Sequence, residues 1–195
     1  MRLKIHASTV TLKRNNDLAL ITGDGRSLPD DLRTFLKWGL QHDVLAIGRS
    51  INLHPGRVGH WLNVDGADSV WWAEHLELKN DGKMPIRHTM GECKGYDVDW
   101  DDGRVTNEPW SGSTALFAVY VALEMGFQKI VLAGCPLDSK GHWFYPPEEL
   151  GPIWTEETYK AWRDFSKTPE ADRVRSLSGF TRETLGLATK ENSNS

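Results

Sequence analysis

The stretch from Ser111 to Asp138 constrains the fold more than any other part of the chain, because it contains a helix and a strand in immediate succession. Small hydroxyl and glycine residues at 111–114 precede the apolar run ALFAVYVALEM, which ends before Gly126. Serine and threonine cap helix N-termini, and apolar residues on nearly every side of a helix indicate that it is buried between layers. The run KIVLAG at 129–134 has no polar alternation, which is typical of a strand covered on both faces of a parallel sheet.

Both ends of this helix–strand unit are places where α/β proteins bind ligands. In open α/β sheets, ligands bind beyond the carboxyl ends of the strands, so residues 134–138 should lie on the rim of a site. The N-terminus of the helix adds free N–H groups and the positive end of the helix dipole, which favour a phosphate or a carboxylate. The candidate ligand-binding residues of this unit are Ser111, Gly112, Ser113, Thr114, Gly134 and Pro136.

Two further strand–helix elements precede this unit. The run LALIT at 18–22 predicts a buried strand, and GDGRS at 23–27 closes it before a helix that Ser27 caps and that runs to about Gly39. The run VLAIG at 44–48 predicts a second strand. Polar residues at the ends of these strands, and of a possible strand at 61–65, complete the predicted ligand site: Gly23, Asp24, Gly25, Ser27, Arg49, Asn52 and Asp65.

The repeated strand–helix order predicts an α/β, Rossmann-like fold with a mostly parallel sheet and helices on both faces. We expect one nucleotide-binding domain over residues 1–189 of the 195, and a disordered polar tail over 190–195. The first 17 residues predict an edge strand or hairpin. The other predicted elements are a helix at 67–78, a strand at 85–89, a hairpin at 96–106, a helix at 156–165, a strand at 174–179 and a helix at 181–185.

The composition favours a small-molecule partner and a cytoplasmic location. A net charge of −4 argues against a dominant nucleic-acid or membrane surface. Cys93 and Cys135 form no CxxC pair, which fits a reducing compartment without a disulfide framework or a zinc site. The N-terminus lacks the apolar segment of a signal peptide, and the longest apolar run is shorter than the ~20 residues that cross a bilayer. The nine tryptophans exceed what one buried cluster explains, so we expect some of them to line a pocket.

Several familiar motifs are incomplete. The turn Gly23-x-Gly25 lacks the third glycine and the later acidic residue of a dinucleotide site, so NAD is not expected. Neither GxxxxGK[ST] nor GxSxG occurs. The acidic segment 97–108 has its glycine at the seventh rather than the sixth place of a calcium loop, which favours a solvated hairpin. An alternative is that Asp97 and Asp99 chelate a divalent ion on a nucleotide diphosphate.

The loop DSKGHWFY at 138–145 supplies the candidate catalytic residues, Asp138 and His142. It follows a predicted core strand and combines a carboxylate, an imidazole and three aromatic rings. Such a loop can stack a base or close over a site, and its alternative role is a surface loop whose aromatic rings pack on the core. A histidine, with a reference pKa near 6.5, can accept a proton at neutral pH.

Two stretches resemble a known superfamily. Residues 22–28, TGDGRSL, resemble its G-x-G-P-S-L turn, and residues 111–134 resemble its helix–strand unit. The superfamily includes bacterial CMP-sialic-acid-dependent sialyltransferases, archaeal 6-hydroxymethylpterin pyrophosphokinase-like proteins and uncharacterised phage and prophage proteins. Arg26 stands where the superfamily turn has proline. The sialyltransferases carry a histidine base after the second stretch, and His142 is the last histidine in this chain.

The resemblance implies a Rossmann-like domain that binds a nucleotide or a nucleotide-activated ligand. The first interpretation is a glycosyltransferase-like enzyme with a CMP-sugar type of donor, in which Asp138 or His142 handles the proton. The second is a pterin-type pyrophosphokinase-like enzyme, which would need Mg²⁺ near its phosphates. The third is a non-catalytic nucleotide-binding phage accessory protein. Donor, acceptor and oligomeric state stay open at this point.

Overall fold

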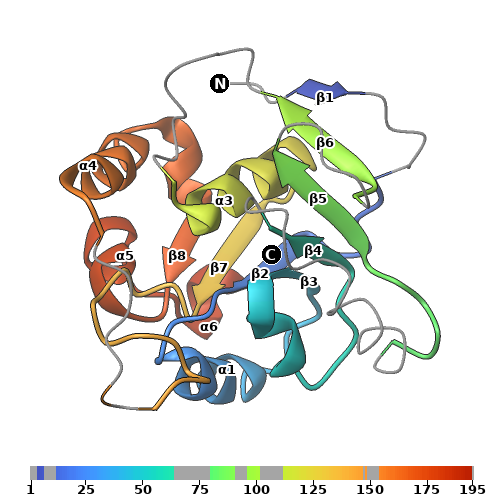
Figure 1. The fold of residues 1–195 in the computed structure, drawn as a ribbon, viewed down its shortest axis with the longest axis horizontal. Coiled ribbons are helices and arrows are strands. Elements are labelled where there is room, and N and C mark those ends of the chain that lie inside the picture. The colour runs from blue at the N-terminus through green and yellow to red at the C-terminus, as the bar shows by residue number, and fades with distance from the viewer. Residues whose placement is uncertain are drawn as a thin grey trace.

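A single eight-stranded sheet forms the centre of the protein (Figure 1). The computed structural model describes residues 4–6, 12–63, 80–90, 96–101, 112–146, 148 and 154–194. The strand order is β1-β6-β5-β4-β3-β2-β7-β8. The strands are β1 (Lys4–His6), β2 (Leu18–Thr22), β3 (Asp43–Ile47), β4 (His60–Leu62), β5 (Ile86–Met90), β6 (Val98–Asp101), β7 (Lys129–Ala133) and β8 (Val174–Ser176).

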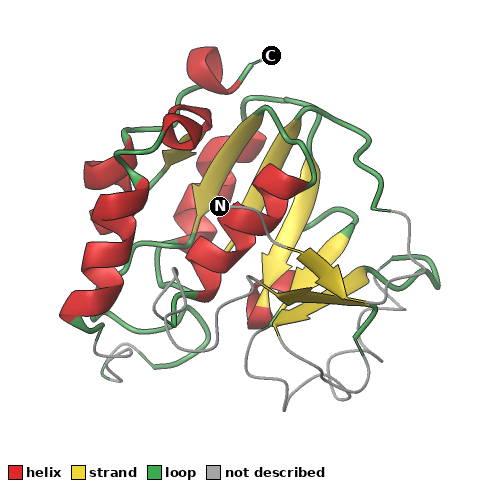
Figure 2. Ribbon diagram, turned by 90° about the horizontal axis from the view of Figure 1, so that it is seen from above, coloured by secondary structure: helices red, strands yellow, loops and turns green. Residues whose placement is uncertain are grey.

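In this order, all neighbouring strands from β6 to β8 are parallel, and the edge strand β1 runs antiparallel to β6. The helices are α1 (Leu28–Leu36), α3 (Thr114–Glu124), α4 (Glu156–Phe165), α5 (Gly179–Leu185) and α6 (Lys190–Ser193), with 3-10 turns at η1 (Gly48–Asn52) and η2 (Pro169–Arg173). Figure 2 shows helices on both sides of the sheet. The α/β, Rossmann-like architecture expected from the sequence is therefore confirmed.

Successive side chains of β2 point to opposite faces of the sheet, and each face has its own part of the hydrophobic core. Ala19 and Ile21 pack in one cluster with α3 and with Trp162 of α4, whereas Leu18 and Leu20 pack with α1 on the other face. All five residues of β2 are buried, as are all five of β3. Helices cover both faces, so these central strands contain apolar runs without alternation.

The helices follow local sequence rules. In α3 the side chain of Ser113 accepts a hydrogen bond from the N–H of Leu116, and apolar residues lie on nearly all sides of the helix. In α1 the buried residues Leu28, Leu32 and Phe35 recur at helical spacing and form one apolar stripe. The apolar surface of each helix matches its burial, because α3 is apolar on nearly all sides and has more buried residues than α1, which has a single apolar stripe.

The structure corrects two predictions about local elements and adds one element that was not predicted. Residues 190–193 form the short helix α6, capped by the side chain of Thr189, so the tail is not disordered there. The segment after β3 is the 3-10 turn η1. Strand β6 pairs in parallel with β5, and the rest of the predicted 96–106 hairpin lies outside the described residues, as does the predicted 67–78 helix.

A buried polar chain crosses the sheet between β4, β5 and β6. The indole N–H of Trp100 donates to Nδ1 of His88 at 3.0 Å, and Nε2 of His88 lies 3.0 Å from Nδ1 of His60. With Nδ1 of His88 accepting, its proton lies on Nε2 and is donated to His60. Burial lowers the pKa of His60 to about 4 and that of His88 to about 3, so both rings are neutral at pH 7. These two histidines have a structural role.

In the part of the chain that the structure describes, no helix is both long and apolar enough to cross a membrane.

Candidate functional site

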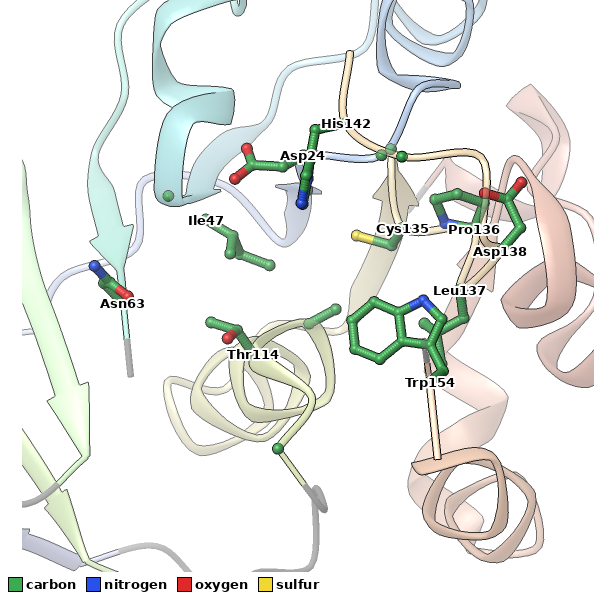
Figure 3. A pocket seen from close by; sticks show the side chains of 17 residues that line it. Asp24, Ile47, Asn63, Thr114, Cys135, Pro136, Leu137, Asp138, His142 and Trp154 are labelled. Carbon is green, nitrogen blue, oxygen red and sulfur yellow. The ribbon is translucent and has the colours of Figure 1, made fainter. Parts of the chain in front are cut away.

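A cavity of about 390 Å³ opens at the carboxyl ends of the central strands, beside the N-terminus of α3 (Figure 3). Its walls come from the ends of β2, β3, β4 and β7, which are adjacent in the sheet although they are far apart in sequence. The lining residues are Gly23, Asp24, Gly25, Ile47, Gly48, Asn63, Gly112, Thr114, Ala115, Gly134, Cys135, Pro136, Leu137, Asp138, Gly141, His142 and Trp154. This is the place at which parallel α/β sheets bind ligands.

Close backbone contact joins the turn after β2 to the segment after β7. The N–H of Gly23 donates to the carbonyl of Ala133, and the N–H of Gly25 donates to that of Gly134, both at 2.8 Å. Gly134 has φ +67, and a Cβ there would lie 2.5 Å from the carbonyl oxygen of Gly23. A Cβ on Gly25 would lie 2.4 Å from Cδ of Pro136. The glycines predicted as ligand residues therefore also allow the two walls of the cavity to touch.

Ser27 lies behind this wall, outside the cavity lining, and makes no side-chain cap bond to α1. Its hydroxyl donates to Oδ2 of the buried Asp31 at 3.0 Å. The same oxygen accepts from the hydroxyl of Ser178 at 2.7 Å and from the N–H of Gly134 at 2.8 Å. Ser27 therefore occupies the predicted N-cap position of α1, where its carbonyl accepts from the N–H of Asp31, but its hydroxyl does not cap the helix and has a structural role beneath the turn.

The N-terminus of α3 forms one side of the cavity. Gly112, Thr114 and Ala115 line it, and the first N–H groups of a helix have no partner within the helix. Ser113 is buried and faces the protein, because its hydroxyl oxygen accepts from the N–H of Leu116 and from the indole of Trp162. Ser111 lies outside the described residues. An anion in the cavity would meet backbone N–H groups here and not the Ser113 hydroxyl.

Asp24 is the most perturbed acid in the cavity. Its Oδ2 accepts from the N–H of Arg49 at 3.2 Å, whereas its Oδ1 is buried and has no hydrogen-bond partner among the described residues. Burial raises the pKa of Asp24 to about 7, and backbone hydrogen bonds from Arg49 and Ser50 oppose this only in part. The carboxyl group is therefore divided between its two protonation states near neutral pH.

His142 lines the cavity near Asp24, from the loop after β7 (Figure 3). Its ring stacks on that of Phe144, with centroids 5.1 Å apart, and Nδ1 is buried without a partner within the described ranges. Burial lowers the pKa of the imidazole, although a hydrogen bond with the backbone of Asp24 raises it. A neutral imidazole with an unsatisfied nitrogen is suited to accept a proton or a hydrogen bond from a ligand.

Asp138 also lines the cavity, but its side chain lies beyond Pro136 and apart from Asp24 and His142 (Figure 3). Its Oδ1 accepts from the N–H of Lys140 at 3.1 Å. Leu137, which lies between Pro136 and Asp138, has φ +48, a left-handed conformation that costs energy for a residue with a side chain. The carbonyl of Leu137 accepts from the hydroxyl of Tyr159, which helps to hold this turn.

Two predicted ligand residues on η1 lie outside the cavity lining. Arg49 places its guanidinium 4.6 Å from the centroid of the Phe144 ring, and it shapes the site through its N–H to Asp24. Asn52 is exposed. Asp65 lies outside the described residues, so nothing is shown of its position.

Sequence reasoning did not identify Asn63 or Gly48 as lining residues, and it placed Cys135 on the rim of the site without giving it a role. Asn63 directly follows β4, whereas the sequence predicted it inside a possible strand at 61–65. Gly48 has φ +50, and a Cβ there would lie 2.7 Å from Oδ2 of Asp24. The thiol of Cys135 points into the cavity in Figure 3, and burial raises its pKa, which disfavours the nucleophilic thiolate form. Trp154 is a lining tryptophan of the kind that the composition predicts.

Comparisons with models of known protein families, with curated protein sequences and with solved structures gave no significant match. Within the described ranges, no group of three or more His, Cys, Asp or Glu side chains is placed to hold a metal ion. The site is therefore interpreted from its own geometry.

Proposed function

We propose that this protein binds a nucleotide or a nucleotide-activated ligand in the cavity, and that it is a transferase of the kind that uses a CMP-sugar donor. The observation that carries this proposal is that the N-terminus of α3, Asp24 and His142 all border one cavity at the carboxyl edge of a parallel sheet. A helix N-terminus favours a phosphate, and the two side chains offer groups that titrate near or below neutral pH.

The geometry supports different tasks for the parts of the site. The N–H groups at the start of α3 bind the phosphate of the donor and stabilise charge on the leaving phosphate. Nδ1 of His142 accepts the proton of an incoming hydroxyl, for which the ring must be neutral. The lowered pKa of the imidazole keeps it neutral at pH 7.

Among the candidate bases, His142 is favoured over Asp138. Nδ1 of His142 is a buried atom without a partner in the described part of the protein, whereas Oδ1 of Asp138 already accepts a backbone N–H. Asp138 also lies away from Asp24 and His142 (Figure 3). We assign Asp138 to the shape of the loop, with its carboxylate holding the Lys140 N–H.

Thermal shift with a panel of nucleotides and CMP-sugars, each with Mg²⁺ and with a chelator, tests the ligand class. A ligand that binds only the folded state, at about 100 times its dissociation constant, adds about 2.7 kcal/mol to the free energy of unfolding. We expect a cytidine nucleotide to raise the melting temperature without needing Mg²⁺. A panel in which no nucleotide raises it would contradict the proposal.

Two variants of Thr114 locate the binding site. Thr114→Glu places a negative charge on the first residue of α3, where it suits the helix dipole but repels a bound phosphate. It should fold normally and lose the nucleotide response, whereas the neutral Thr114→Gln should keep most of it. Asn52→Ala, at the exposed C-terminal residue of η1, should respond as the unaltered protein does.

A further inference from the structure

Arg26 joins the turn after β2 to the loop that carries His142. Its backbone N–H donates to the carbonyl of Gly141 at 3.1 Å. In its guanidinium, Nε donates to the carbonyl of Lys140 at 2.8 Å and an Nη donates to that of Pro146 at 2.9 Å. One side chain therefore binds the loop on both sides of His142 and closes residues 140–146 into a ring.

The two backbones also pair directly. Gly25 and His142 form an isolated antiparallel bridge, and the N–H of Trp143 donates to the carbonyl of Asp24 at 3.1 Å. Residues opposite each other in an antiparallel pair are close neighbours, so this bridge sets the distance between Asp24 and His142 along the cavity wall. The bridge has only two backbone hydrogen bonds, and a ladder this short is not stable on its own.

We infer that Arg26 is a positioning residue: by clamping residues 140–146 onto the 23–27 turn, it fixes the imidazole of His142 beside Asp24 before any ligand arrives. Both groups have a buried polar atom without a partner in the described ranges, Oδ1 of Asp24 and Nδ1 of His142. Such atoms are costly unless something satisfies them, and a ligand hydroxyl, which can donate and accept, is matched to a pair of this kind.

The fixed loop has a consequence for the function proposed above, on which the ligand part of this inference rests. The ordering cost of the loop is met by protein contacts, so the ligand does not have to supply it on binding. Proline cannot provide these contacts because it has neither a backbone N–H nor a guanidinium. Arginine at this position thus makes three hydrogen bonds to the loop that a proline there could not make.

The test compares Arg26→Ala and Arg26→Lys with the control Arg33→Ala, which removes an exposed arginine of α1 that pairs with Asp30. Lysine keeps the charge but cannot donate to two carbonyls in a fixed geometry. Amide hydrogen exchange at Trp143 reports the bridge, because its N–H donates to Asp24. The pKa of His142, followed by NMR, reports the position of the ring, since burial is the main cause of its lowered value.

We expect exchange at Trp143 to become about tenfold faster or more in both Arg26 variants, which corresponds to about 1.4 kcal/mol. The pKa of His142 should rise toward the ordinary value of about 6.5 in both variants and stay unchanged in Arg33→Ala. Unchanged exchange would overturn the clamp. A pKa that rises in Arg26→Ala but not in Arg26→Lys would show that Arg26 acts through its charge alone, and would overturn the positioning role.

Neither measurement needs a ligand, so the clamp and the proposed function can fail separately. If both signals change as expected but the unaltered protein responds to no nucleotide, the clamp stands and the function fails. If nucleotides bind, Arg26→Lys should weaken the affinity several-fold. If Arg26→Lys shows faster exchange at Trp143 but binds the nucleotide as tightly as the unaltered protein, the claim that the fixed loop contributes to binding is overturned.

Discussion

Asp24 lies in the turn after β2 and Asp31 in the helix α1 that follows it, and burial raises the pKa of both, yet their surroundings differ. Oδ2 of Asp31 accepts from the N–H of Gly134 and from the hydroxyls of Ser27 and Ser178, at 2.7 to 3.0 Å. Asp24 accepts hydrogen bonds from the backbone of Arg49, at 3.2 Å, and of Ser50, whereas its Oδ1 has no partner in the described part of the chain. The first carboxylate is satisfied by the protein, and the second faces a cavity.

This comparison shows that burial alone does not separate a structural acid from a functional one. A buried polar group in a native protein nearly always has a hydrogen-bond partner, so an exception calls for an explanation. The histidines follow the same rule, because His60 and His88 are bonded in a chain, whereas Nδ1 of His142 is not. Of the residues that line the cavity, Asp24, His142 and Trp154 each have a buried side-chain atom without a partner in the described part of the chain, and the proposed function assigns roles to the first two.

The largest effect should come from His142→Ala. If His142 is the base, turnover should fall by about 10²- to 10⁴-fold, because that is the usual contribution of a positioned general base, while nucleotide affinity should change only a few fold. Steady-state kinetics with a CMP-sugar donor, together with a binding titration, measures both. A normal turnover with a lost affinity would instead make His142 part of a binding lid.

Asp24→Asn should change stability with a distinctive pH dependence. The folded pKa of Asp24 is raised from 3.8 to about 7, so its favourable contribution is present below pH 3.8 and is lost as the pH rises to 7. Asparagine has no such loss. The variant should therefore gain stability relative to the unaltered protein across this range, by up to roughly 4 kcal/mol above pH 7, at about 1.4 kcal/mol for each pKa unit.

Chemical denaturation at about pH 4.5, 6 and 8, which span most of the range over which Asp24 titrates, measures the difference in the free energy of unfolding between the variant and the unaltered protein. A stability difference that does not vary with pH would contradict the raised pKa and weaken the contrast with Asp31. A gain in stability accompanied by a loss of the nucleotide response would sharpen it, because functional sites often cost stability.

Asp31→Ala should lower the free energy of unfolding, and by less than Asp24→Asn raises it. It leaves the buried N–H of Gly134 without an acceptor, so the free energy of unfolding should fall by about 2–3 kcal/mol. The matched control is Asp30→Ala, whose exposed carboxylate pairs with Arg33 and should contribute less than about 1 kcal/mol. Denaturation at pH 7 checks both, and a stabilised Asp31→Ala variant would erase the distinction between the two aspartates.

The central architecture follows from local signals in the amino-acid sequence. The predicted strand at 18–22 and helix at 156–165 agree with β2 and α4. The predicted strand at 44–48 differs from β3 by one residue at each end, and that at 129–134 differs from β7 by one residue at its C-terminal end. Apolar runs, capping hydroxyls and glycine stops are local signals, because a strand or helix forms from neighbouring residues. The order of these elements was enough to predict a mostly parallel sheet.

The sequence also indicated the edge of the sheet where the cavity lies, since the carboxyl ends of parallel strands meet there. Gly112, Thr114, Pro136 and His142 were expected near a site, and each lines the cavity. Their roles in binding or catalysis remain predictions. Ser27 illustrates the limit, because a serine before a helix suggests a cap, and only the packed structure shows its hydroxyl turned to Asp31.

Which buried polar groups have a hydrogen-bond partner depends on the tertiary structure and cannot be predicted from local sequence. The N–H of Gly134 reaches Asp31 across 103 positions, and Nε of Arg26 reaches the carbonyl of Lys140 across 114. No local pattern encodes such a pair, because each depends on how two separate strand ends pack against one another. A hydrogen bond requires donor and acceptor within about 3 Å and in line, so whether Oδ1 of Asp24 finds a partner is set by the assembled fold and not by its neighbours in sequence.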